Sequence, residues 1–163
     1  MSEAVSSSYA HLKEFMDWAV PNQSTEESTK IIQDMIVKYG LKEDFTLGIF
    51  SPDAQELWGA TGFHLREGPL KNGSAEIGMW IRKEKAHQGL GAQILRTMIQ
   101  WGFSEWPWER LSWRCDIENK ASQRTAEKAG MLLEGCLKSH RLKSDGTRSD
   151  TLFFSVLRRN NQS

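Results

Sequence analysis

The chain has 163 residues, 39% of them hydrophobic and 26% charged, a composition typical of one globular domain with a buried core. Its 21 lysines and arginines balance its 21 aspartates and glutamates, so no basic field favours a nucleic-acid or anionic-lipid partner. The apolar runs are far shorter than the roughly 20 residues of a membrane span, and the N-terminal sequence MSEAVSSSYA lacks the features of a signal peptide. These two observations predict a cytoplasmic protein with no membrane partner, and we expect residues 1–163 to form one domain.

The first half of the chain predicts a helix followed by three strands. The sequence STEE, which begins at Ser24, is a capping box, and the apolar residues after it predict a helix that ends near Gly40. Residues 45–50 and 57–65 are rich in β-forming residues and are separated by a Ser-Pro-Asp turn, so we expect a hairpin. Residues 75–82, AEIGMWIR, are apolar enough to form an inner strand.

The second half alternates helices and strands. A long helix is predicted after the glycine-rich turn at Gly89, because apolar residues recur on one of its faces. A shorter helix, residues 120–129, has Asn119 as its N-cap and Gly130 as its closing residue. Three segments have strand-like patterns: 111–117, 131–142 and 151–158. This order of elements predicts an α/β (α+β) domain with a mixed sheet.

The two cysteines, Cys115 and Cys136, lie in predicted strands. There is no CxxC spacing and no histidine at metal-ligand spacing. We therefore expect reduced thiols in or near the core and no metal site.

The sequence AHQGLGAQ, which begins at Ala86, places a glycine-rich turn between a predicted strand and a predicted helix. Free N–H groups at a helix N-terminus, and the close approach that glycine permits, favour a phosphate there. A nucleoside-triphosphate loop would need Gly-Lys-Ser/Thr, but Ala92 and Gln93 follow Gly91. A dinucleotide fold would need a third glycine where Ile94 stands. The alternative that the glycines only shape a tight turn stays equally open from these residues alone.

Four motifs occur in an order that is similar to a known family: AEIGMW at 75–80, GLG at 89–91, Asn119-x-x-Ser122, and AEKAGMLLEG at 126–135. They resemble the GNAT superfamily of acetyl-CoA-dependent N-acetyltransferases, and within it the RimJ/RimL-like branch of ribosomal-protein N-terminal acetyltransferases. The resemblance extends from about Ser7 to Leu157. It implies a single GNAT-type domain with a mixed, mostly antiparallel sheet flanked by helices, and direct acetyl transfer to a primary amine in a ternary complex.

The resemblance also implies where acetyl-CoA would bind. In this superfamily, backbone N–H groups of the glycine turn hold the coenzyme A pyrophosphate, which here implies the amides of His87, Gln88, Gly89, Leu90, Gly91 and Ala92. The family usually has Gln or Arg where this chain has Ala86, so a side chain of His87, Gln88 or Arg82 could compensate. The strand residues Met79, Trp80 and Ile81 would pair with the pantetheine arm, and an N–H of Met79 or Trp80 would stabilise the oxyanion.

Catalysis needs a proton donor for the departing thiolate and a proton acceptor for the amine, because only the unprotonated amine attacks a thioester. The resemblance assigns the donor role to Ser122 and a cofactor-binding role to Asn119, which could equally be a helix cap. Glu76 is the first candidate for the base, or else a structural or substrate-orienting carboxylate. The branch can have another glutamate where this chain has His140 and Arg141, so His140 is an alternative base or substrate-binding residue.

The acceptor is expected to be a protein N-terminus, with a polyamine or antibiotic-like amine as the alternative. Trp18 belongs to the first helical region, which borders the acceptor groove in this family, so it lines the substrate site or simply packs. A non-catalytic acetyl-CoA-binding regulatory domain is a further alternative. Few residues precede this region, so we expect the family's first strand to be missing or shortened, and the exposed sheet edge could pair two copies in a homodimer.

Overall fold

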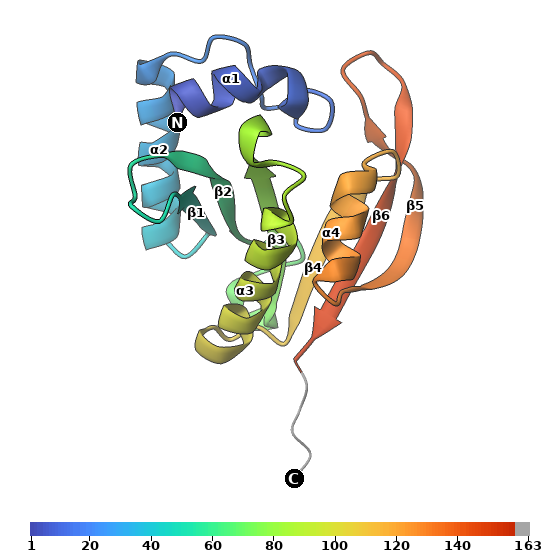
Figure 1. Ribbon diagram of the computed structural model, residues 1–163. Helices are drawn as coiled ribbons and strands as arrows, with labels where there is room; N and C mark the ends of the chain where they lie inside the picture. The colour runs from blue at the N-terminus through green and yellow to red at the C-terminus, as the bar shows by residue number, and fades with distance from the viewer. Residues whose placement is uncertain (159–163) are drawn as a thin grey trace. The chain divides into compact units, whose positions relative to one another are not determined.

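The computed structural model describes residues 1–158. Within them the chain forms four α-helices, two 3-10 helices and six strands (Figure 1): α1 (Ser2–Leu12), α2 (Thr25–Gly40), β1 (Asp44–Phe50), β2 (Leu57–His64), η1 (Leu70–Asn72), β3 (Ser74–Ile81), η2 (Lys83–Lys85), α3 (Leu90–Glu105), β4 (Arg110–Asp116), α4 (Lys120–Lys128), β5 (Leu132–Leu142) and β6 (Arg148–Leu157). The strand order is β1-β2-β3-β4-β6-β5, with β3 and β4 parallel and the pairs β1–β2, β4–β6 and β5–β6 antiparallel. The predicted α/β class with a mixed sheet is confirmed.

The described residues form two compact units. Unit 1 comprises residues 1–64 and 78–90, and unit 2 comprises residues 65–77 and the chain from Gly91 onward. The boundary falls inside β3, so the first half of that strand belongs to unit 2 and the second half to unit 1. One domain over 1–163, of which residues 159–163 lie outside the described part, stays a prediction.

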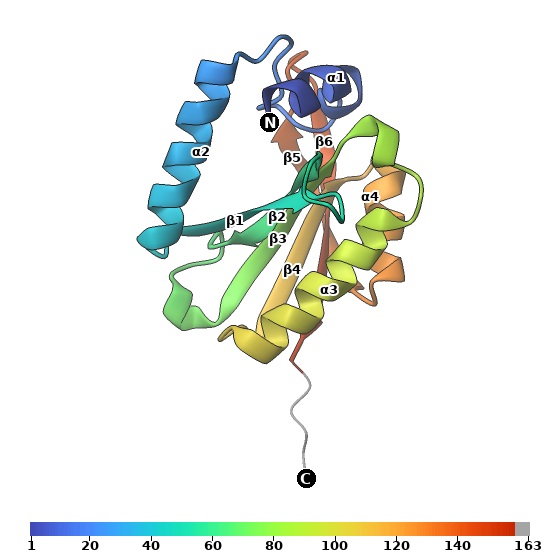
Figure 2. The same ribbon diagram turned by 60° about the vertical axis from the view of Figure 1, so that its left-hand side comes forward.

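In unit 1, α2 runs alongside the β1–β2 hairpin (Figure 2). The predicted capping box is present, since the Glu27 N–H donates to Ser24 Oγ at 3.1 Å and the Ser24 N–H donates to Glu27 Oε2 at 2.8 Å. The predicted hairpin is also confirmed, and its cross-strand pair Phe45 and Phe63 is buried. Local sequence signals therefore determined these elements correctly.

In unit 2, α4 packs against β4 (Figure 1), where the alternate residues Leu111, Trp113 and Cys115 are buried. The end of α4 is followed by Gly130 with a left-handed φ of +86°, as predicted. β6 starts at Arg148, earlier than the predicted residue 151, because its pairing with β5 continues up to the turn. Both cysteines of the chain are free thiols.

The N-terminal region differs from the expectation. The first helix, α1, ends at Leu12, and the EFMDW segment follows it in turns, so Trp18 lies after the helix rather than within it. No strand precedes α1 in residues 1–158, and β1 is an edge strand of the sheet. Within this part of the chain, no helix has both the length and the apolar character needed to cross a membrane.

Candidate active site

The glycine-rich turn connects β3 to α3 through η2. His87 and Gly89 have φ values of +60° and +81°, both in the left-handed region, and α3 begins at Leu90. N–H groups around such residues form an anion-binding concavity, to which the first N–H groups of a helix add. A side chain added at Gly89 would meet no atom within 4 Å, so there is open space beside the turn. The predicted pyrophosphate amides, residues 87–92, thus belong to one continuous turn and helix start, and their binding of a diphosphate stays a prediction.

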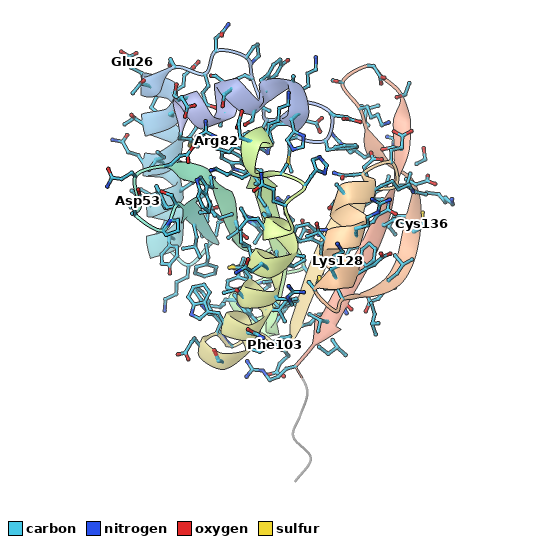
Figure 3. All side chains as sticks on the ribbon, in the orientation of Figure 1. Glu26, Asp53, Arg82, Phe103, Lys128 and Cys136 are labelled. Carbon is cyan, nitrogen blue, oxygen red and sulfur yellow. The ribbon has the colours of Figure 1, made fainter. Side chains whose placement is uncertain are left out.

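The side chains expected to compensate for Ala86 have different surroundings. Gln88 Nε2 donates to the carbonyl of Glu84 at 2.8 Å, which closes the turn. Arg82 is buried (Figure 3), and its guanidinium forms ion pairs with three carboxylates: Glu3, Glu56 and Glu84. His87 is exposed at the turn. A phosphate contact by any of the three stays a prediction.

Helix α1 is attached to the segment that enters this turn. The Lys83 N–H donates to Ser8 Oγ at 3.1 Å, and Ser8 is completely buried. The His11 ring, at the end of α1, lies edge-to-face with the His87 ring, with 6.3 Å between the ring centroids. Burial lowers the pKa of His11 below its ordinary value of 6.5, and the neighbouring His87 lowers it further. His11 is therefore neutral at pH 7.

The end of β3 carries the predicted pantetheine-binding residues Met79, Trp80 and Ile81. Pairing of β3 with β4 covers Ser74, Ala75 and Glu76, all in unit 2. In unit 1, the Gly78 carbonyl accepts a hydrogen bond from Thr61 Oγ1 at 2.9 Å, and the Arg82 N–H donates to the Trp58 carbonyl at 2.8 Å. These bonds fix the end of β3 against β2.

Trp18 packs against this end of β3. Its ring lies edge-to-face with that of Trp80, with 5.9 Å between the centroids, and Trp18 is 46% exposed. The structure thus brings the predicted substrate-binding residue Trp18 next to a predicted cofactor-binding residue. The contact with Trp80 shows that Trp18 packs, and its role in lining a substrate site stays a prediction.

Glu76 lies between two guanidinium groups in unit 2. Its Oε1 is 3.3 Å from Arg66 Nε, and its Oε2 is 2.5 Å from Arg114 Nε, although the second approach is not aligned as a hydrogen bond. The carboxylate is nearly buried, with an exposed fraction of 9%. This geometry favours the structural or orienting role over the role of base, and Glu76 as the base stays a prediction.

Ser122 lies in the first turn of α4, and its N–H donates to Asn119 Oδ1 at 2.9 Å, the N-cap bond expected of Asn119. Trp113 Nε1 donates to Ser122 Oγ at 2.9 Å. A hydroxyl that accepts one hydrogen bond keeps its own O–H as a donor, and the Ser122 side chain is also hydrogen-bonded to Cys115. Ser122 as the proton donor stays a prediction. Nearby, burial raises the pKa of the Cys115 thiol to about 11, so this cysteine is neutral at pH 7.

His140 lies on β5 and is exposed. Its Nδ1 is 3.0 Å from Thr151 Oγ1 on β6. The other catalytic candidates of this unit interact with other side chains: Glu76 forms ion pairs, and Ser122 accepts a hydrogen bond. His140 as a base or substrate-binding residue stays a prediction.

One pair of polar residues was missed by the sequence analysis. Asp44 and His64 face each other at the open end of the β1–β2 hairpin, and His64 Nδ1 is 2.7 Å from Asp44 Oδ2. The signal was available in principle, because antiparallel pairing of the predicted strands 45–50 and 57–65 brings the residue before the first strand opposite the end of the second. The structure therefore adds a carboxylate–histidine pair to the candidate residues.

The candidate residues divide between the two units. Unit 1 contains Trp18, His64, Met79, Trp80, Ile81, His87, Gln88, Gly89 and Leu90, and unit 2 contains Glu76, Gly91, Ala92, Asn119, Ser122 and His140. In residues 1–158, no three His, Cys, Asp or Glu side chains converge in a way that could hold a metal ion.

Comparison with known proteins agrees with the motifs and the fold. A family model described as an acetyltransferase (GNAT) domain matches residues 3–132. The uncharacterized N-acetyltransferase YoaA of Bacillus subtilis (strain 168) is 30% identical over 136 residues, 83% of this chain and 75% of that protein. The ribosomal-protein-serine acetyltransferase of Escherichia coli (strain K12) is 29% identical over 146 residues, 90% of this chain and 79% of that protein.

A solved structure of RimL, a ribosomal L7/L12 α-N-protein acetyltransferase in complex with coenzyme A, matches with a TM-score of 0.85 and 25% identity, covering 96% of this chain and 85% of that one. The chain belongs to the GNAT family of N-acetyltransferases, in the branch that includes the ribosomal-protein acetyltransferases.

Proposed function

We propose that this enzyme transfers the acetyl group of acetyl-CoA to a primary amine by direct attack in a ternary complex. The observation that carries the proposal is the turn between His87 and Gly89, whose left-handed residues lead into the N-terminus of α3 in a chain of this family. The amides of residues 87–92 would hold the pyrophosphate, and the backbone of residues 79–81 would pair with the pantetheine arm.

The residues of the chain support each step of the transfer. The unprotonated amine nitrogen attacks the thioester carbonyl carbon, and an N–H of Met79 or Trp80 stabilises the negative charge that develops on the carbonyl oxygen. The C–S bond then breaks, and Ser122 Oγ–H gives its proton to the departing sulfur. The hydrogen bond from Trp113 supports this role, because it orients the hydroxyl oxygen without using the proton.

We infer that the acceptor is the α-amino group of a protein N-terminus. Two relatives are named for acetylation of ribosomal proteins, which supports this acceptor class. An α-amino group has a pKa of about 7.7 to 8.0, against about 10.4 for lysine, so much more of it is unprotonated near neutral pH. A small amine, such as a polyamine, is the alternative acceptor.

Calorimetric titration with acetyl-CoA tests the cofactor site. Gly91→Trp puts a large side chain at the turn and should abolish binding. Gln100→Trp adds the same bulk at an exposed position further along α3 and should bind acetyl-CoA like the wild type. No binding by the wild type would contradict the acetyl-CoA proposal, whereas equal binding by both variants would contradict the assignment of the pyrophosphate to this turn.

A further inference from the structure

The Asp44–His64 pair is held in a single orientation within unit 1. His64 Nδ1 and Asp44 Oδ2 are 2.7 Å apart, and the other carboxylate oxygen, Oδ1, accepts a hydrogen bond from Thr46 Oγ1 at 2.8 Å. The His64 side chain is 17% exposed and the Asp44 side chain is 31% exposed. The imidazole is therefore fixed by its carboxylate partner, yet it remains within reach of water.

This arrangement determines which nitrogen of His64 can accept a proton. A carboxylate at Nδ1 selects the tautomer in which Nδ1 carries the hydrogen and Nε2 has the free lone pair. A carboxylate in this position also stabilises the imidazolium that forms when Nε2 takes up a proton. The charged group at His64 on β1 is Asp44, and its contact on β3 is the uncharged Gly78.

Nε2 of His64 lies against β3. A Cβ added at Gly78 would be 2.7 Å from His64 Nε2 and 2.9 Å from Cδ2, so the ring occupies the space that a side chain would fill. The Gly78 carbonyl is fixed by its hydrogen bond from Thr61. Only glycine at this position lets the imidazole approach the strand so closely.

The same short part of β3 contains the groups proposed to meet the thioester. Gly78 is followed directly by Met79 and Trp80, whose backbone N–H groups are the candidates for oxyanion stabilisation. Trp18 packs on Trp80 at this end of the strand. The accepting nitrogen of the Asp44–His64 pair therefore lies against Gly78, the residue that directly precedes the proposed oxyanion-stabilising N–H groups.

The alternative base on β3 is engaged elsewhere. Glu76 has one guanidinium at each carboxylate oxygen, from Arg66 and Arg114. His64, in contrast, has a carboxylate at Nδ1, and its Nε2 lies beside Gly78, the residue before the proposed oxyanion-stabilising N–H groups. Among these groups, His64 has the arrangement that a general base requires.

We propose that His64 accepts the proton of the attacking amine, directly or through one water, and that Asp44 is its positioning residue. This inference rests on the proposed acetyl transfer. As the amine nitrogen bonds to the carbonyl carbon, its proton passes to Nε2, and the C–S bond breaks with protonation of sulfur by Ser122. His64 then releases its proton to solvent, and the Ser122 hydroxyl regains one from solvent, so both residues return to their starting states.

The test uses the full chain, acetyl-CoA and two probe amines, a peptide with a free N-terminal serine and spermidine. His64→Gln should lower kcat by about 10²- to 10⁴-fold, the usual contribution of a general base. Its dissociation constant for acetyl-CoA should stay within about twofold of the wild type, because His64 is not among the cofactor-binding residues.

Asp44→Asn tests the positioning role. We expect a lower kcat with little change in KM, because the His64 ring loses the carboxylate that fixes its orientation and tautomer. The matched control is Asp53→Asn, which removes a charge at an exposed position in the turn between β1 and β2 and should leave the rates unchanged.

Each result bears on a different claim. If His64→Gln keeps the wild-type rate, or loses acetyl-CoA binding along with its activity, the role of His64 as base is overturned. A wild-type protein that binds acetyl-CoA but releases no thiol with either amine overturns both the base assignment and the proposed amine transfer. A wild-type protein that does not bind acetyl-CoA contradicts the proposed function first.

Discussion

Ser122 has a structural contact and a proposed chemical role, and the two can be measured separately. Ser122→Ala should lower kcat by about 10²-fold with unchanged acetyl-CoA binding, because it removes the proposed proton donor. The same change leaves Trp113 Nε1 without its acceptor and should lower the free energy of unfolding by about 1 to 2 kcal/mol in urea. Ser104→Ala, at an exposed position near the end of α3, is the control. A full rate in Ser122→Ala would rule out the role of the hydroxyl as acid.

Glu134 should make stability depend on pH in the acid range. Hydrogen bonds from Arg110 and Ser155 lower its pKa from 4.5 to about 2. The folded state therefore binds fewer protons than the unfolded state between these values, so the stabilisation is complete above about pH 4.5 and is lost as the pH falls toward 2. Urea unfolding at about pH 7, 5 and 3 should show a smaller acid loss in Glu134→Gln than in the wild type. The control is Glu105→Gln at the exposed end of α3, and an acid loss as large in Glu134→Gln as in the wild type contradicts the assignment.

Some residue contacts could be predicted from sequence and others could not. The N-cap bond of Asn119 was predictable because both partners lie within one helical turn. The ion pairs of Glu76 were not, because Arg66 and Arg114 lie on other segments of unit 2, and their approach depends on strand register. For the same reason, the distance from Asp44 to His64 required the actual register of the hairpin.

At the scale of elements, strong local signals in the sequence correctly predicted α2, α4 and the β1–β2 hairpin, but they did not predict α1. The buried positions of α1 include Ala4, Val5 and Ser8, which are small or polar and do not form the large apolar stripe that sequence analysis recognises. Small residues allow α1 to approach η2 closely, where Ser8 accepts the N–H of Lys83. The docking of α1 therefore depends on tertiary contacts rather than on helix amphipathicity.

Arg82 should contribute most of the stabilisation that holds α1 against the rest of unit 1. Its guanidinium is buried and bonds to Glu3 and Ser7 on α1 as well as to Glu56 before β2. Arg82→Gln should lower the free energy of unfolding by about 2 kcal/mol, the scale of hydrogen bonds to charged groups. The control is Arg124→Gln, at an exposed position of α4. Equal stability of the two variants in urea would show that Arg82 does not fasten the helix.

His11, at the end of α1, should make the stability of the protein depend on pH near neutrality. Because burial and then His87 lower its pKa in the folded state, that state binds fewer protons than the unfolded state just below pH 6.5. Stability should therefore fall as the pH drops below about 6.5. Urea unfolding at about pH 7.5 and 5.5 should show a smaller fall in His11→Gln, and an identical fall in both proteins would contradict the predicted effect of burial.

At the scale of the whole molecule, β1 is an edge strand, and an uncovered edge favours pairing with another chain. We expect association of two copies that increases with concentration. Phe50, at the end of β1, is 54% exposed, so Phe50→Lys should weaken the association by placing a charge at the edge. Light scattering over a concentration series measures this, and a monomeric mass of the wild type at every concentration would contradict the expectation.

Release of free thiol from acetyl-CoA shows whether the protein acetylates an amine. The wild type is incubated with a peptide that has a free N-terminal serine, and separately with the same peptide blocked by N-acetylation. We expect thiol release only with the free peptide, in an amount equal to that of the acetylated product identified by mass spectrometry. Equal thiol release with both peptides, or none from a protein that binds acetyl-CoA, would contradict this expectation.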